Sequence, residues 1–203
     1  MIDHPETYWR RWPGSHVVIM ASGPSMCSED AGFVQRSGLR SITVNSTWQL
    51  APWADAHYSS DADWWVENLQ EMRHRARGEF WSGHPGGVAH DVRQCPYRKG
   101  ARGLYKPPGA IAWGGNSGYC AIGLAYQFGA RRIILLGYDQ QGDHWHPEHP
   151  LKIRKPANFP MWAERFGELA RDCEAAGVEV INASRETSLT CFRRATLTEA
   201  LQC

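Results

Sequence analysis

The chain has 203 residues, of which 42% are hydrophobic and 21% charged, a composition typical of one folded domain. Its formal net charge of +1 provides no general attraction to nucleic acid or to a membrane surface. The N-terminus lacks the apolar core of a signal peptide, and no apolar run is long enough to span a bilayer. The six cysteines are scattered without a CxxC pair, so we expect a single domain over residues 1–203 in a reducing cytoplasm.

The first half of the chain alternates short β-branched runs with helical patterns. The runs predict strands over residues 16–20, 41–45, 55–60 and 79–83. The patterns between them predict helices over residues 28–37 and 61–75, with a short helical turn after the second strand. Each strand is therefore followed by a segment that can cross back over the sheet.

The second half begins with residues 83–115, a stretch rich in Gly, Pro and basic residues that has no clear period. A loop of this length inside a compact domain is often functional. The pattern then predicts helices over 117–128 and 159–176 and strands over 131–137 and 178–184. Alternation of this kind predicts an α/β, Rossmann-like fold with a mostly parallel sheet and helices on both faces. Ligands of such folds bind outside the carboxyl ends of the strands.

The motif ASGPS follows the first predicted strand. Gly23 would let the backbone approach a ligand, and Ser22 and Ser25 flank it with hydroxyl groups. Backbone N–H groups at the following helix start favour a phosphate. The alternative is a simple turn in which Ser25 or Ser28 caps the helix.

Two further polar segments follow predicted strands or open helices. Asn45 ends the second strand, where its amide can contact a base or sugar edge or cap the next turn. Asn116, Ser117 and Gly118 open the helix at 117, which makes a second group of hydrogen-bond donors suited to an anion. We expect this segment and ASGPS to converge on one pocket.

The motif DADWW follows the third predicted strand. An Asp-x-Asp pair can hold Mg²⁺ on a diphosphate, and Asp61 can equally be the N-cap of the next helix. Residues two apart on a helix do not face the same way. We therefore expect Asp61, and not Asp63, to matter for a metal-bound ligand.

The segment GYDQQGDHWHPEHP leaves the strand at 131–137 and concentrates titratable groups. His144, His146 and His149 lie close together with Asp143 and Glu148. A histidine titrates near neutral pH and suits general base catalysis or a phosphate contact. A zinc site is the second interpretation, although the spacing matches no standard signature, and solvent-exposed histidines are the third.

The order of these motifs resembles that of bacterial lipooligosaccharide sialyltransferases, which use CMP-sialic acid. It also resembles 6-hydroxymethylpterin pyrophosphokinase-like proteins, motility accessory factors and uncharacterised proteins of tailed phages and prophages. The resemblance extends from Val17 to Leu201 and rests on motif order rather than on one motif. It implies a nucleotide pocket lined by the following residues: Ser22, Gly23, Pro24, Ser25, Asn45, Asn116, Ser117, Gly118, Tyr138 and Asp139.

The resemblance implies a nucleotide- or nucleotide-sugar-binding transferase, most closely a glycosyltransferase. The segment KPANFPMW has no histidine where the transferases carry their base, which leaves His144 and His146 as candidate catalytic residues together with Asp139. The acceptor is a glycan, modified DNA or a small molecule, and the protein is compatible with a homo-oligomer in the cytoplasm of a bacterial host. The alternatives are diphosphate transfer from ATP, with Asp61 and Asp139 holding Mg²⁺, and a non-catalytic phage protein that sequesters a nucleotide.

Overall fold

The structure is a computed structural model that describes residues 9–84, 88–147 and 157–202. Its strands are β1 His16–Met20, β2 Arg40–Val44, β3 Ala56–Ser59, β4 Glu79–Ser82, β5 Val92–Gln94, β6 Arg132–Leu136, β7 Glu179–Asn182 and β8 Arg193–Arg194. Its helices are α2 Ser28–Ser37, α3 Ala62–Arg75, α4 Ser117–Gln127, α5 Phe159–Ala175 and α6 Leu197–Gln202, with a 3₁₀ helix η1 at Asn45–Gln49. None of the described helices is both long and apolar enough to cross a membrane.

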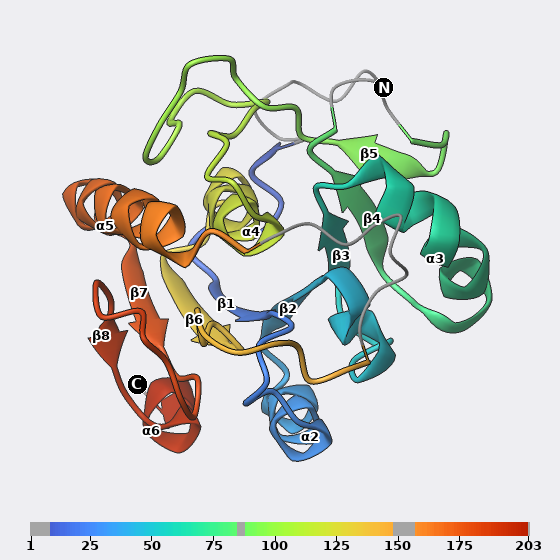
Figure 1. The fold of residues 1–203 in the computed structure, drawn as a ribbon, viewed down its shortest axis with the longest axis horizontal. Helices are drawn as coiled ribbons and strands as arrows, with labels where there is room; N and C mark the ends of the chain where they lie inside the picture. Colours follow the sequence, from blue (N-terminus) through green and yellow to red (C-terminus); the bar gives the residue numbers. More distant parts are fainter. Residues whose placement is uncertain (1–8, 85–87, 148–156, 203) are drawn as a thin grey trace.

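All eight described strands form one parallel sheet in the order β5-β4-β3-β2-β1-β6-β7-β8. The chain moves outward from β1 to β5, then returns through α4 to place β6 on the other side of β1 (Figure 1). The sheet then grows in the opposite direction through β7 and β8. The predicted α/β, Rossmann-like fold is confirmed, and the strand order reverses between β1 and β6.

Helices cover both faces of the sheet (Figure 1). Because successive strand residues point to opposite faces, Val17 and Ile19 of β1 pack in the cluster that contains α4 and α5. Val18 and Met20 pack instead in the cluster that contains α2 and α6. The strand β1 is therefore apolar on both sides, as expected of a strand covered by helices on both faces.

Three described elements were not predicted from the sequence. The strand β5 lies in the Gly- and Pro-rich stretch, and β8 is a pair of exposed arginines at the sheet edge. Helix α6 has a recognisable signal, because Thr196 and Glu199 exchange hydrogen bonds as a capping box. Its Thr-x-x-Glu spacing is present in the sequence.

Candidate functional site

A cavity of about 750 Å³ opens at the carboxyl ends of the central strands. This volume lies within the range of small-molecule sites. The position is the point at which strand order reverses, where open α/β sheets bind their ligands. The cavity is lined by the ends of β1, β2, β3 and β6, the starts of α4 and α5, and parts of residues 83–115 and 138–146.

The structure brings most of the predicted site residues to this cavity. The predicted residues at its wall are Ser22, Gly23, Asn45, Asp61, Asn116, Ser117, Gly118, Tyr138, His144 and His146. The loop ASGPS and the start of α4 therefore meet at one cavity. Pro24, Ser25 and Asp139 are not among the described residues that line it.

Gly23 has a packing role that the sequence did not reveal. Its N–H donates to Gly137 O at 2.9 Å, and a Cβ at this position would lie 2.4 Å from both Gly137 O and Asp139 Oδ1. The glycine thus lets the loop after β1 pack directly against the loop after β6. This contact between loops, rather than a close approach to a ligand, is what the structure shows Gly23 to permit.

Asp139 connects the same two loops from below the cavity wall. Its carboxylate accepts hydrogen bonds from Ser25 N at 2.7 Å and Ser25 Oγ at 2.8 Å, and its side chain is buried. Burial raises the pKa of the Asp139 carboxyl, while both bonds from Ser25 lower it. Ser25 therefore does not cap α2, whose N-cap is Cys27. The observed contacts make Asp139 a positioning residue, and its predicted catalytic role stays a prediction.

The start of α4 is fixed by a small hydrogen-bond network. Asn116 Oδ1 accepts from Tyr119 N at 2.8 Å as the N-cap, and Ser117 Oγ accepts from Ser60 N at 3.1 Å. Gly118 O accepts from the Tyr138 hydroxyl at 2.9 Å. The first turn of α4 is thereby held against the ends of β3 and β6, with its backbone facing the cavity.

Asp61 occupies the N-cap position of α3, but its side chain makes no capping hydrogen bond. The prediction that Asp61 is the N-cap residue is therefore confirmed in position, without a capping bond from its side chain. The residue lies on the cavity wall, whereas Asp63 is exposed and outside it. Asp61 is thus positioned to serve as one ligand of Mg²⁺ held jointly with phosphate oxygens, and Asp63 is not.

His144 and His146 lie side by side on the cavity wall. Their rings stack with centroids 5.0 Å apart and planes 28° apart. His146 Nδ1 donates to Pro147 O at 2.7 Å, which leaves Nε2 as the proton-accepting nitrogen of the neutral ring. The pKa of His146 is lowered, mainly by burial and also by the nearby His144. The hydrogen bond to Pro147 opposes this shift without reversing it. The His146 ring is therefore held neutral, as a general base requires.

The segment that carries these histidines is anchored above β1 and β2. Trp145 N donates to Ser22 O at 3.3 Å, and Trp145 Nε1 donates to Thr47 Oγ1 at 3.2 Å. His149 and Glu148 lie outside the described residues. Within the described ranges, no group of three or more His, Cys, Asp or Glu side chains is arranged to hold a metal ion, so the predicted zinc interpretation has no support there.

Four residues of the cavity wall each have a buried polar side-chain atom without a hydrogen-bond partner in the described part of the chain. These atoms are Asn45 Oδ1, Gln140 Oε1, Asn116 Nδ2 and Trp162 Nε1. Buried polar groups are ordinarily paired, so unpaired ones require an explanation such as a bound water or ligand. Asn45 and Gln140 also have the positive φ angles of 49° and 52°, and backbone strain of this kind gathers at functional sites.

Sequence reasoning missed several residues of the wall. They are His84, Tyr97, Trp113, Gln140, Phe159 and Trp162. Most come from segments without a recognisable period, so no local pattern could assign them. The start of α5 does carry a signal, because Asn158 caps the helix through a bond from Met161 N and Pro160 follows in the first turn.

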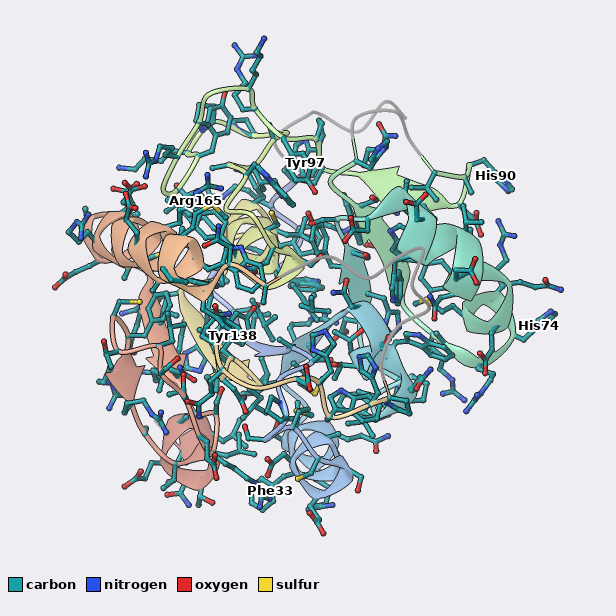
Figure 2. The ribbon with its side chains drawn as sticks, viewed as in Figure 1. Phe33, His74, His90, Tyr97, Tyr138 and Arg165 are labelled. Atoms are coloured by element: carbon teal, nitrogen blue, oxygen red, sulfur yellow. The ribbon has the colours of Figure 1, made fainter. Side chains whose placement is uncertain are left out.

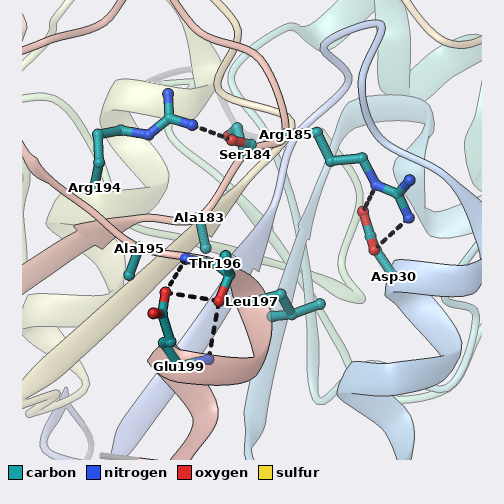
Figure 3. A pocket seen from close by; sticks show the side chains of 9 residues that line it. All are labelled: Asp30, Ala183, Ser184, Arg185, Arg194, Ala195, Thr196, Leu197 and Glu199. Carbon is teal, nitrogen blue, oxygen red and sulfur yellow. Dashed lines mark hydrogen bonds and ion pairs between the residues drawn. The ribbon is translucent and has the colours of Figure 1, made fainter.

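A second cavity, of about 530 Å³, lies beside α6 and near the start of α2 (Figure 3). Its charged side chains all have hydrogen-bond partners within the protein. Arg185 donates twice to the Asp30 carboxylate at 2.9 Å, and Arg194 donates to Ser184 O at 2.7 Å. No residue predicted to bind ligand lines it, and its ion pair connects α2 to the segment after β7.

Comparison with models of known protein families, with curated proteins and with solved structures finds no match for this chain.

Proposed function

We propose that this protein binds a nucleotide or nucleotide sugar in the cavity at the ends of β1, β2 and β6 and transfers a glycosyl group from it. The observation that carries the proposal is the set of cavity-wall residues that have an unpaired buried polar atom. Asn45 Oδ1 and Gln140 Oε1 are acceptors, which suit the ribose hydroxyls or an exocyclic amino group of a nucleotide. Asn116 Nδ2 and Trp162 Nε1 donate, as phosphate or carboxylate oxygens require.

The charged side chains on the described wall of the cavity do not by themselves attract an anion, because they include two aspartates and no Lys or Arg. Among the described residues of the wall, none is Lys or Arg, and the carboxylate and imidazole side chains are Asp61, Asp143, His84, His144 and His146. We therefore expect backbone N–H groups at the start of α4 to hold the phosphate. Asp61 adds a position for Mg²⁺, which would neutralise charge on the phosphate oxygens.

In the proposed transfer, a hydroxyl oxygen of the acceptor attacks the anomeric carbon of the donor. The bond between that carbon and the phosphate oxygen breaks, and its electron pair stays on the nucleotide phosphate. The acceptor proton passes to the imidazole of His144 or His146. His146 is the better prepared of the two, since its Nδ1–H bond to Pro147 orients the ring.

Diphosphate transfer from ATP draws less support from the geometry. That reaction would use Asp61 and Asp139 together on Mg²⁺, but the Asp139 carboxylate accepts both its hydrogen bonds from Ser25 and does not line the cavity. A protein that only sequesters a nucleotide would use the same cavity without a base. Turnover separates this alternative from a transferase.

The proposal is tested by a thermal shift screen of nucleotides and nucleotide sugars, followed by a search for released nucleotide with the ligand that binds. A ligand at 100 times its Kd stabilises the native state by about 2.7 kcal/mol, or roughly 5–10 °C in Tm for a domain of this size. We expect His144→Gln or His146→Gln to reduce turnover by about 10²–10⁴-fold while leaving nucleotide Kd unchanged.

The matched control is His74→Gln on α3, because His74 is exposed and outside the cavity (Figure 2). Full turnover in both cavity variants would exclude the assigned base. The absence of any nucleotide-dependent shift in the wild type would contradict the proposal as a whole.

A further inference from the structure

We propose that Trp113, backed by Tyr97, is the platform on which the base of the nucleotide stacks. The proposal rests on the proposed function and names the part of the cavity that selects a nucleoside over a simple sugar phosphate. It starts from an exposed side chain. Trp113 is 40% exposed, and in the described part of the chain only Phe33 and Val66 are comparable large hydrophobic residues.

Trp113 differs from the other two because it lines the cavity. Its ring lies 4.7 Å from that of Tyr97, with the planes tilted by 47°. An aromatic face open to a cavity and supported by a second ring is the arrangement that stacks a planar base. Phe33 instead lies on the outer side of α2 (Figure 2), where Arg36 packs over its ring.

The two rings are held on rigid backbone. An isolated β-bridge joins Tyr97 to Ile111, two residues before Trp113, through Arg98 N to Ile111 O at 2.8 Å and Ile111 N to Pro96 O at 3.1 Å. Backbone hydrogen bonds therefore hold the segments that carry the two rings against each other. Both rings come from residues 83–115, which showed no period in the sequence.

Neighbouring groups fix the Tyr97 ring and the backbone beside Trp113. The Tyr97 hydroxyl donates to Ser60 O at 3.4 Å, and a Cβ on Gly83 would lie 2.4 Å from Tyr97 Cε1. A Cβ on Gly114 would lie 1.9 Å from the Tyr119 ring, so the backbone beside Trp113 is pressed against α4. Burial raises the pKa of the Tyr97 hydroxyl, which keeps it a neutral donor to Ser60.

The position of the platform fits a nucleotide that spans the strand ends. Tyr97 is bonded to Ser60, directly after β3, and β3 lies two strands from β1 in the sheet. Two strand spacings correspond to about 10 Å, which separates the platform from the loop after β1. A base on Trp113 would thus leave its phosphate near Ser22 and the start of α4.

The test compares ligands that share a phosphate and differ in the base. Binding of nucleoside monophosphates and of ribose 5-phosphate is measured by calorimetry for wild type, Trp113→Ala, Trp113→Phe and the control Phe33→Ala. Removal of a stacking face weakens base binding by about 5- to 150-fold. We expect Trp113→Ala to show this loss with nucleotides and no change with ribose 5-phosphate, while Trp113→Phe keeps most of the affinity and Phe33→Ala keeps all of it.

Nucleotide binding by Trp113→Ala that equals the wild type overturns the platform and leaves the proposed function intact. Weaker binding of a methyl glycoside with unchanged nucleotide binding would assign Trp113 to the acceptor and likewise overturn it. If the wild type binds no nucleotide, the proposed function and the platform both fail. Thermal unfolding of each variant shows whether the fold is retained.

Discussion

Gly23→Ala tests whether the loops after β1 and β6 depend on direct backbone contact. The added Cβ would lie 2.4 Å from the carbonyl oxygen of Gly137, inside the 3.0 Å that real Cβ contacts respect. The loops must therefore separate by more than half an ångström. The separation strains the hydrogen bond from Gly23 N to Gly137 O and the two bonds from Ser25 to Asp139.

The expected loss of stability in Gly23→Ala follows from these contacts. Overpacking typically costs about 1–3 kcal/mol, and a weakened hydrogen bond adds about 0.5–1.5 kcal/mol. We expect the free energy of unfolding to fall by about 3 kcal/mol, or roughly 6–12 °C in Tm, in urea and thermal unfolding followed by circular dichroism.

The control is Gly167→Ala in the middle of α5. The nearest atom to a Cβ there is Arg171 Nη1 at 3.8 Å, and alanine favours a helix over glycine by roughly 0.5–1 kcal/mol. Gly167→Ala should therefore be neutral or stabilising. A Gly23→Ala protein that unfolds within about 2 °C of the wild type would refute the claim that the two loops are in contact through this glycine.

Two further predictions concern His57 and Asp61. His57 Nε2 donates to Arg77 O and its Nδ1 accepts from Thr43 Oγ1, both at 2.6 Å, and burial lowers its pKa to about 4 from 6.5. Between pH 4 and pH 6.5 the unfolded state binds one more proton at His57 than the folded state does. The free energy of unfolding therefore decreases as the pH is lowered through this range. When the pH is lowered from 7 to 4, the free energy of unfolding measured in urea should decrease by about 3 kcal/mol more for the wild type than for His57→Gln. Parallel pH profiles of the two proteins would contradict this. For Asp61, we expect Mg²⁺ to tighten nucleotide binding in the wild type and in Asp63→Asn but not in Asp61→Asn; equal losses in both variants would show that the assigned geometry is wrong.

The sequence was sufficient to predict the central sheet, because β1 and β6 are apolar on both faces and the central strands are followed by turn residues or helix starts. The sequence was insufficient to predict the two edge strands of the sheet, β5 and β8. The strand β8 is a pair of exposed arginines, and β5 has one buried residue in three, so neither carries a pattern of burial. Edge strands this short are defined by the neighbour they pair with rather than by their own side chains.

The residues of the site also fall into those that local sequence patterns predict and those that only the tertiary structure brings together. Asn116 and Ser117 were predictable because they open a helix after a glycine pair, and the histidines because they follow a buried strand. The bond between Ser25 and Asp139 joins residues 114 positions apart, and the meeting of Tyr97 with Trp113 depends on a tertiary β-bridge. No local spacing reveals such contacts. Asp61 was placed correctly at a helix start, but its side chain lies on the cavity wall instead of capping the helix.

The central claim is that a nucleotide occupies the cavity at the reversal of strand order. The most direct measurement is a crystal structure of the protein with the nucleotide that gives the largest thermal shift. We predict that its phosphate lies beside Ser22 and the first turn of α4, with hydrogen bonds to Asn45 and Asn116 and the base against Trp113. A nucleotide found in the cavity beside α6, or anywhere else on the molecule, would contradict the claim.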